Sequence, residues 1–180
     1  MKHIVVDSRI FEFPDSWLVV KYDDLPYYQE KLRCRASGSK GWKREMKGVD
    51  LIAMDMSAKE PVMFLIESKD YRVYRRGKSM SPAEEFVQKV LDTLTGILPV
   101  ILSNSSRTRE EEALAMQVRK ARHLRLVYQF EQPAKQSKLF PRAFDPADMQ
   151  MEIRRELKAI DPHACVIEAS LQHRVCWNVR

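Results

Sequence analysis

Residues 48–55 read GVDLIAMD and residues 62–70 read VMFLIESKD, and these two stretches decide the fold. The second begins with a five-residue apolar run, which is typical of a strand buried on both faces of a sheet. The first is also apolar, and the residues between the two include Pro61, as expected of a turn. Antiparallel pairing brings the start of the first strand close to the end of the second. The pattern therefore predicts that Asp50 lies beside Glu67 and Lys69.

The residue types at this place indicate a chemistry. Side chains alternate along a strand, so Glu67 and Lys69 share one face, about 6–7 Å apart, and Ser68 takes the other. Mg²⁺ prefers oxygen ligands and is often held by one or two carboxylates together with water and substrate phosphate. Asp50 and Glu67 are the candidate ligands for Mg²⁺ or Mn²⁺, with the backbone carbonyl of Ser68 as a third oxygen. Lys69 would orient or deprotonate a water molecule, or stabilise charge on a phosphate.

Gly48-Val49-Asp50, a turn, an apolar strand and Glu67-Ser68-Lys69 together resemble the PD-(D/E)xK nuclease superfamily. The resemblance covers roughly residues 32–130, and Gly48-Val49 replaces the proline position of the superfamily's name. It implies an α/β fold with a restriction-endonuclease-like αβββαβ core, in which helices flank a mixed central sheet. It also implies Mg²⁺ or Mn²⁺ as the cofactor and hydrolysis of DNA, or occasionally RNA. Asp50 and Glu67 match the metal ligands of the superfamily, and Lys69 matches its catalytic lysine.

A helix is expected to begin after Ser81, a good N-cap residue, with Pro82 in its first position. Apolar residues at helical spacing predict its buried stripe, namely Phe86, Val87, Val90, Leu91, Leu94 and Leu98. The apolar run at 99–102 either extends this helix past its proline or forms a brief strand. In the superfamily this helix often lends a polar residue to the site. Gln88 is the best match and is expected to bind the attacking water or the phosphate, with an exposed surface role as the alternative.

The remaining segments complete one α/β domain over residues 1–180, with a core at about 26–131 and a C-terminal extension at about 132–180. Glu30 and Glu45 are further candidate site carboxylates, with solvation as the alternative. Residues 16–21 are expected to form an early strand or the start of a packed segment. The other expected elements are helices at 26–35, 109–122 and 147–160, and strands at 124–130, 165–169 and 174–179.

The net charge of +6 favours a polyanionic partner, although many basic proteins have none. Two basic clusters bracket the acidic residues and would neutralise phosphates along a nucleic acid, with DNA favoured over RNA. The alternative is a solvated basic loop. The clusters consist of Lys40, Lys43, Arg44 and Lys47 before Asp50, and of Arg72, Arg75, Arg76 and Lys78 after Lys69.

Several classes of protein are disfavoured. The chain has no apolar stretch of about eighteen residues and no secretory leader, so neither a membrane span nor a membrane partner is expected. Three widely spaced cysteines form no zinc or disulfide pattern, which suits the cytoplasm. The sequence thus predicts a metal-dependent nuclease, working as a homodimer or with a partner subunit. The alternatives are a catalytically inactive nucleic-acid-binding or assembly subunit on the same fold, and a protein-interaction scaffold.

Overall fold

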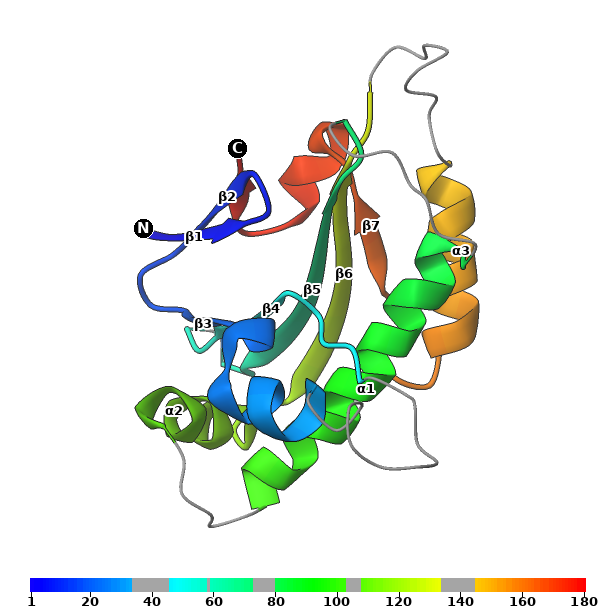
Figure 1. The fold of residues 1–180 in the computed structure, drawn as a ribbon. Helices are drawn as coiled ribbons and strands as arrows, with labels where there is room; N and C mark the ends of the chain where they lie inside the picture. Colours follow the sequence, from blue (N-terminus) through cyan, green and yellow to red (C-terminus); the bar gives the residue numbers. More distant parts are fainter. Residues whose placement is uncertain (34–45, 58, 73–79, 103–107, 134–144) are drawn as a thin grey trace, which may run out of the picture.

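The computed structural model describes residues 1–33, 46–57, 59–72, 80–102, 108–133 and 145–180. It has an α/β architecture in which a five-stranded mixed sheet carries helices on one face and a three-stranded sheet on the other (Figure 1). Along the chain the strands and helices are β1 (Lys2–Val6), β2 (Arg9–Phe13), β3 (Leu18–Lys21), η1 (Tyr22–Asp24), η2 (Tyr28–Leu32), β4 (Leu51–Asp55), β5 (Val62–Asp70), α1 (Pro82–Leu102), α2 (Arg109–Val118), β6 (His123–Glu131), α3 (Pro146–Leu157), β7 (Cys165–Ile167), η4 (Ala169–Arg174) and β8 (Asn178–Val179).

The main sheet has the strand order β3-β4-β5-β6-β7. β3, β4 and β5 are antiparallel, whereas β5, β6 and β7 are parallel. In the β4–β5 register Leu51 lies opposite Ile66, which confirms the predicted antiparallel pairing and brings Asp50 to the level of Glu67. Parallel neighbours need a long crossover, and α1 and α2 provide it between β5 and β6.

The second sheet has the strand order β1-β2-β8 and contains strands from both ends of the chain. β1 and β2 form a hairpin that has no counterpart among the predicted elements, and β8 pairs with β2. Figure 1 shows this small sheet on the side of the main sheet away from α1 and α3.

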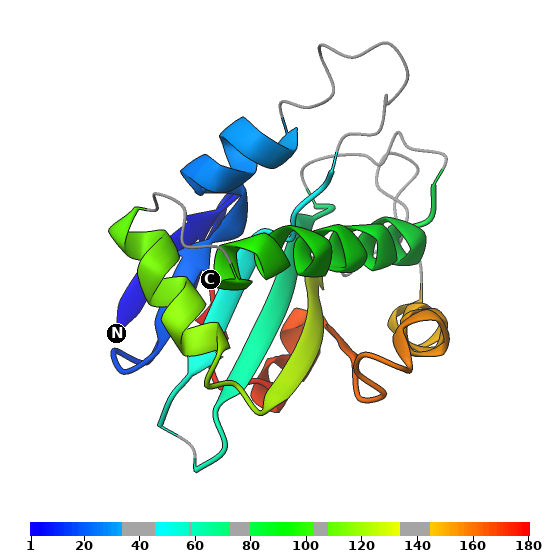
Figure 2. The ribbon, with the colours of Figure 1, turned by 90° about the horizontal axis from the view of Figure 1, so that it is seen from below.

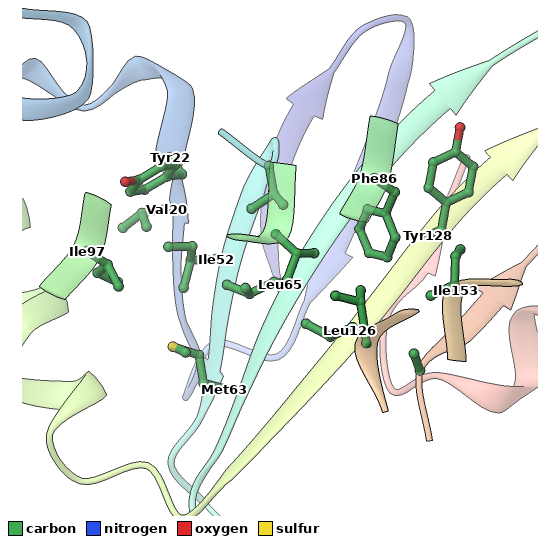
Figure 3. Packing of buried hydrophobic residues seen from close by; sticks show 14 of the residues in the cluster. Val20, Tyr22, Ile52, Met63, Leu65, Phe86, Ile97, Leu126, Tyr128 and Ile153 are labelled. Atoms are coloured by element: carbon green, nitrogen blue, oxygen red, sulfur yellow. The ribbon is translucent and has the colours of Figure 1, made fainter. Parts of the chain in front are cut away.

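Hydrophobic residues are buried on both faces of the main sheet. Full burial of a leucine, isoleucine or phenylalanine side chain stabilises the folded state by about 1.5–3 kcal/mol. One cluster fills the space toward α1 and α3 (Figure 3) and includes Ile52, Leu65, Leu126, Phe86 and Ile153. The other lies under the small sheet and includes Phe11, Phe13, Trp17, Leu51, Ile66 and Trp177. Because Leu65 and Ile66 face opposite ways, Glu67 belongs to the helix side of β5 and Ser68 to the other side.

The element order differs in detail from the predicted αβββαβ core. Among the described residues, two strands, β4 and β5, lie between η2 and α1, and the third antiparallel strand, β3, precedes η2. The edge strands β3 and β7 therefore come from outside the predicted core of 26–131. None of the described helices combines the length and apolar composition needed to cross a bilayer.

Helix α1 continues past Pro99 to Leu102, so the helical extension is the one of the two expected outcomes that the structure has. The helix differs from its prediction in the burial of two residues. Leu91 and Leu98, predicted to be buried, are instead 45% and 53% exposed. The physical reason is that α1 carries two apolar faces, and the sheet covers only the one that contains Phe86 and Ile97.

We expect Gly96→Ala to destabilise the protein by about 1–2 kcal/mol, although alanine normally favours a helix over glycine. A Cβ atom at Gly96 would lie 2.5 Å from Leu32 Cδ1 and 2.6 Å from the buried Tyr22 hydroxyl. Urea unfolding followed by circular dichroism measures the change. Met116→Ala, at a 55% exposed position of α2, is the matched control and should be close to neutral. Equal effects of the two substitutions would contradict the packing described for Gly96.

Candidate functional site

Asp50 and Glu67 lie side by side at the end of the β4–β5 pair. Asp50 directly precedes β4 and is 8% exposed, and Glu67 lies in β5 and is 1% exposed. The amide of Ser68 donates a hydrogen bond of 2.7 Å to Asp50 Oδ2, so the carboxylate of one strand is tied to the backbone of the other. The structure therefore brings together the two carboxylates that the sequence proposed as metal ligands.

Two lysine amines reach these carboxylates. Lys69 Nζ lies 2.7 Å from Glu67 Oε1 and 4.0 Å from Asp50 Oδ2. Lys89 Nζ, from α1, lies 2.6 Å from the same Glu67 oxygen and 3.4 Å from Asp50 Oδ1. The site is thus a quartet of two buried acids and two partly buried bases, drawn from the residue before β4, the end of β5 and the first half of α1.

Lys89, rather than the predicted Gln88, is the residue of α1 that reaches the two carboxylates. Gln88 instead lines a separate groove of about 390 Å³, together with Glu84, Val87 and Leu91 of the same helix and with Glu152 of α3. Successive helix residues are 100° apart, so adjacent side chains face different surroundings. Lys89 lies on the side of α1 that contains the buried Phe86 and Val90, and the predicted stripe did not single out this side.

The segment before Asp50 is attached to α1 by hydrogen bonds from its backbone amides to side chains of the helix. The amide of Lys47 donates to Asp92 Oδ2 at 3.1 Å, and the amide of Val49 donates to Thr93 Oγ1 at 3.0 Å. Asp92 and Thr93 are adjacent, so one turn of the helix holds both ends of this short segment. These bonds fix the position of Asp50 relative to Lys89.

Gly48 is required within this segment. Its amide donates to the Tyr28 hydroxyl at 2.9 Å, and that hydroxyl in turn donates to the carbonyl of Met46 at 3.0 Å. A Cβ atom at Gly48 would lie 2.7 Å from Tyr22 Cδ1. A glycine therefore lets the chain pass close enough to these two aromatic rings to deliver Asp50 to the site.

Ser68 supports the site from the opposite face of β5. Its hydroxyl accepts a hydrogen bond from Nη2 of Arg9, which also donates to the carbonyl of Gln129 at 2.9 Å. Arg9 is 1% exposed, and burial lowers the pKa of its guanidinium. The group of Ser68 that contacts Asp50 is the amide, so the proposed ligand role of the Ser68 carbonyl stays a prediction.

Burial and charge shift the protonation of the quartet. Burial, followed by the proximity of Asp50, raises the pKa of Glu67 to about 7. Burial disfavours the charged form of Lys69, but Glu67 and Asp50 outweigh this and raise the pKa of Lys69 above its ordinary value. The same balance raises the pKa of Lys89. Both amines are therefore cations at neutral pH, whereas Glu67 titrates there.

A cavity of about 310 Å³ opens beside the quartet. Its walls come from η1, η2, the segment before β4, the end of β5 and the first turns of α1. Burial, followed by the proximity of Asp50, raises the pKa of Asp23 in this wall. The lining residues are Asp23, Tyr28, Arg33, Lys47, Gly48, Lys69, Glu85 and Lys89.

Of the eight basic residues proposed to bind nucleic acid, two lie in the described part of the chain. Lys47 lines the cavity, and Arg72 forms an ion pair with Asp70 at 2.6 Å. The other six, Lys40, Lys43, Arg44, Arg75, Arg76 and Lys78, lie outside the described residues. Of the other two candidate carboxylates, Glu30 is largely exposed and lies 4.0 Å from Lys31, and Glu45 is also outside the described residues.

The donor set fits a hard divalent cation. No group of three or more His, Cys, Asp or Glu side chains in the described ranges is arranged to hold a metal ion. Mg²⁺, however, is commonly bound by one or two protein carboxylates and keeps several waters. Glu67 Oε2 is buried and has no hydrogen-bond partner among the residues that the structure describes, so one carboxylate oxygen is available to a cation.

Comparison with known proteins gives a limited likeness. No protein-family model matches the chain. The chain is similar to a cysteine–tRNA ligase of Neisseria meningitidis serogroup A / serotype 4A (strain DSM 15465 / Z2491), with 27% identity over 171 residues. The match covers 81% of this chain but only 23% of the length of that ligase. The chain thus spans less than a quarter of its relative, and the ligase's activity does not follow from the match.

The pKa of Glu67 predicts a pH-dependent stability. The folded protein holds the Glu67 proton more tightly than the unfolded chain, whose glutamate has a pKa near 4.5. Its contribution to stability is therefore complete below about pH 4.5 and is lost as the pH rises through about 7. Glu67→Gln cannot ionise. Relative to the wild type, it should gain stability between pH 5 and pH 8, by up to about 3 kcal/mol.

Urea unfolding at both pH values, without divalent ions, measures this difference. Glu30→Gln removes a largely exposed glutamate and is the matched control, for which no such gain is expected. A Glu67→Gln difference that is the same at pH 5 and pH 8 would contradict the raised pKa.

Proposed function

We propose that this chain is a metal-dependent nuclease of the PD-(D/E)xK type, which hydrolyses phosphodiester bonds with Mg²⁺ or Mn²⁺. The observation that supports the proposal best is the meeting of Asp50, Glu67 and Lys69 beside a cavity with basic walls. The αβββαβ core of that superfamily is part of the proposal. The mixed sheet, with three antiparallel strands followed by a helical crossover to a parallel strand, is compatible with it.

Each residue of the site would have a separate role in the reaction. Asp50 and Glu67 would hold the divalent ion, which when bound polarises the scissile phosphate and lowers the pKa of an attacking water. Lys69 and Lys89 are cations held in place by the carboxylates. Each can donate to a phosphate oxygen and stabilise the charge that develops there. Lys47 and Arg33, farther along the cavity wall, would contact the neighbouring phosphates.

DNA is the favoured substrate, and RNA is tested beside it. The partial likeness to a cysteine–tRNA ligase makes tRNA a specific candidate. The assay therefore includes plasmid DNA, single-stranded DNA and unmodified tRNA.

The second candidate function is a catalytically inactive nucleic-acid-binding or assembly subunit on the same fold. One observation favours it. The ammonium groups of Lys69 and Lys89 already contact both carboxylates, so Asp50 and Glu67 have counter-ions without a metal ion. Binding to DNA that weakens steeply with added salt, without cleavage in Mg²⁺ or Mn²⁺, would support this function over the first.

Replacement of the site residues should abolish cleavage. We expect Asp50→Asn, Glu67→Gln and Lys69→Met each to lower the rate at least about 100-fold, since each removes a group that acts on the reacting phosphate or its metal ion. Gel assays with Mg²⁺ and Mn²⁺ measure the rate. Gln88→Ala is the matched control on α1 and should cleave like the wild type. Equal activity of Glu67→Gln and wild type would overturn the proposed mechanism.

Lys89 gives a separate test of the metal site. Its ammonium group lies between the two proposed ligands and competes with a divalent cation for them. We therefore expect Lys89→Ala to bind Mn²⁺ about tenfold more tightly than the wild type, and Gln88→Ala to bind it equally well. Isothermal titration calorimetry with MnCl₂ measures the affinity. A heat of binding that persists unchanged in an Asp50→Asn, Glu67→Gln double variant would place the ion elsewhere.

A further inference from the structure

Helix α1 carries an apolar stripe on its outer side. Figure 2 shows α1 crossing in front of the main sheet, between α2 and α3. Three leucines on its outer side are strongly exposed, Leu91 at 45%, Leu98 at 53% and Leu102 at 71%. Contiguous exposed apolar surface on a helix marks a site of association. The exposed Thr95 and two half-buried residues that also touch the core complete the stripe, whose members are Val87, Leu91, Leu94, Thr95, Leu98 and Leu102.

The stripe is symmetrical about the peptide bond between Leu94 and Thr95. Leu91 lies three residues before Leu94, and Leu98 lies three residues after Thr95. Val87 and Leu102 lie seven residues out on either side. At about 100° per residue all six side chains fall within an arc of about 100°, the width of a stripe that normally faces a core. Read from either end, the stripe has the same spacing, with leucine in both positions of the 91/98 pair, valine and leucine in the outer pair, and leucine and threonine at the centre.

Such a surface is complementary to itself. In a two-fold arrangement the same patch is used by both subunits, and residue i contacts residue j reciprocally. Two copies of α1 crossing antiparallel at Leu94–Thr95 would place Leu91 of one copy against Leu98 of the other. Val87 would meet Leu102 of the second copy. Thr95, whose hydroxyl donates to the carbonyl of Leu91, leaves room for close approach at the axis.

The charges at the two ends of the stripe are also complementary. The groove beside the first half of α1 is lined by Glu84 together with Glu152 and Glu156, against a single arginine, Arg155. At the other end, Nη2 of Arg119 donates to the carbonyl of Ile101 and places a guanidinium beside Leu102. An antiparallel pair brings Arg119 of each copy to the acidic end of the other.

We propose that the outer stripe of α1 is the two-fold interface of a homodimer of this chain. The inference is independent of the proposed nuclease function. Lys89 lies on the side of α1 opposite the stripe, so the interface leaves the cavity beside the carboxylates open in each copy.

Sedimentation velocity and light scattering test the dimer directly. We expect a dimer with a dissociation constant of about 10 µM or tighter. Leu98→Gln should weaken it about 100-fold or more, because a two-fold interface contains each substitution twice. Met151→Gln, at a 65% exposed position on α3, is the matched control and should dimerise like the wild type. A wild-type monomer at every concentration, or a dimer that Leu98→Gln leaves intact, would overturn the proposal.

Cross-linking tests the position of the axis. In a Cys34→Ser, Cys165→Ser, Cys176→Ser background, Thr95→Cys should form a disulfide-linked dimer on mild oxidation, because Thr95 lies next to the axis. Met151→Cys in the same background should not. Circular dichroism checks that each variant is folded. Cross-linking at position 151 but not at position 95 would place the interface elsewhere and overturn the proposal.

A charge exchange tests the antiparallel direction. Glu84→Arg and Arg119→Glu should each weaken the dimer at least about tenfold, since each brings like charges together. The double variant restores opposite charges across the interface and should recover most of the affinity. A double variant weaker than both single variants would contradict the antiparallel arrangement.

Discussion

Two neighbouring buried carboxylates impose the main constraint on this structure. Asp50 and Glu67 are almost fully removed from water, which costs several kcal/mol per charge unless partners compensate. Lys89, Lys69 and the amide of Ser68 supply that compensation. Each partner comes from a different feature of the fold: the crossover helix, the end of β5 and the antiparallel register. The surroundings of the two carboxylates therefore depend both on the position of α1 on the sheet and on the register of β4 and β5.

Much of this arrangement could be predicted from the sequence because its signals are local. The apolar run before Glu67 identifies a buried strand, and Ser81-Pro82 identifies the start of α1. The position of Asp50 follows from antiparallel pairing across a short turn. The choice between Gln88 and Lys89 could not be made in this way, since it depends on the rotation of α1 about its own axis. That rotation is set by packing against Leu65 and Leu126, which no neighbouring residue specifies.

Other features depend on contacts between distant parts of the chain. The β1–β2 hairpin is stabilised by pairing with β8 and by the contact of Arg9 with Ser68, partners far away in the sequence. The exposure of Leu91 and Leu98 has a related cause, because α1 has apolar residues on two faces and spacing alone does not say which face the sheet covers. Through Arg9, the first strands of the chain also support β5 behind Glu67, which makes the hairpin part of the site's framework.

The parallel pairing of β5 with β6 has a consequence for the order of folding. Val62 pairs with His123, so the whole crossover that contains α1 and α2 lies between the two paired strands. Parallel pairs of large sequence separation are slow to form, because the loop between them loses its entropy first. Phe86 packs on Tyr128 of β6, with ring centroids 5.4 Å apart, so α1 is seated firmly only after β6 joins. We therefore expect Lys89 to reach the carboxylates late. A ribosome-bound chain that lacks β6 would carry the acidic pair without its helical counter-ion, a state that amide exchange on stalled chains would detect.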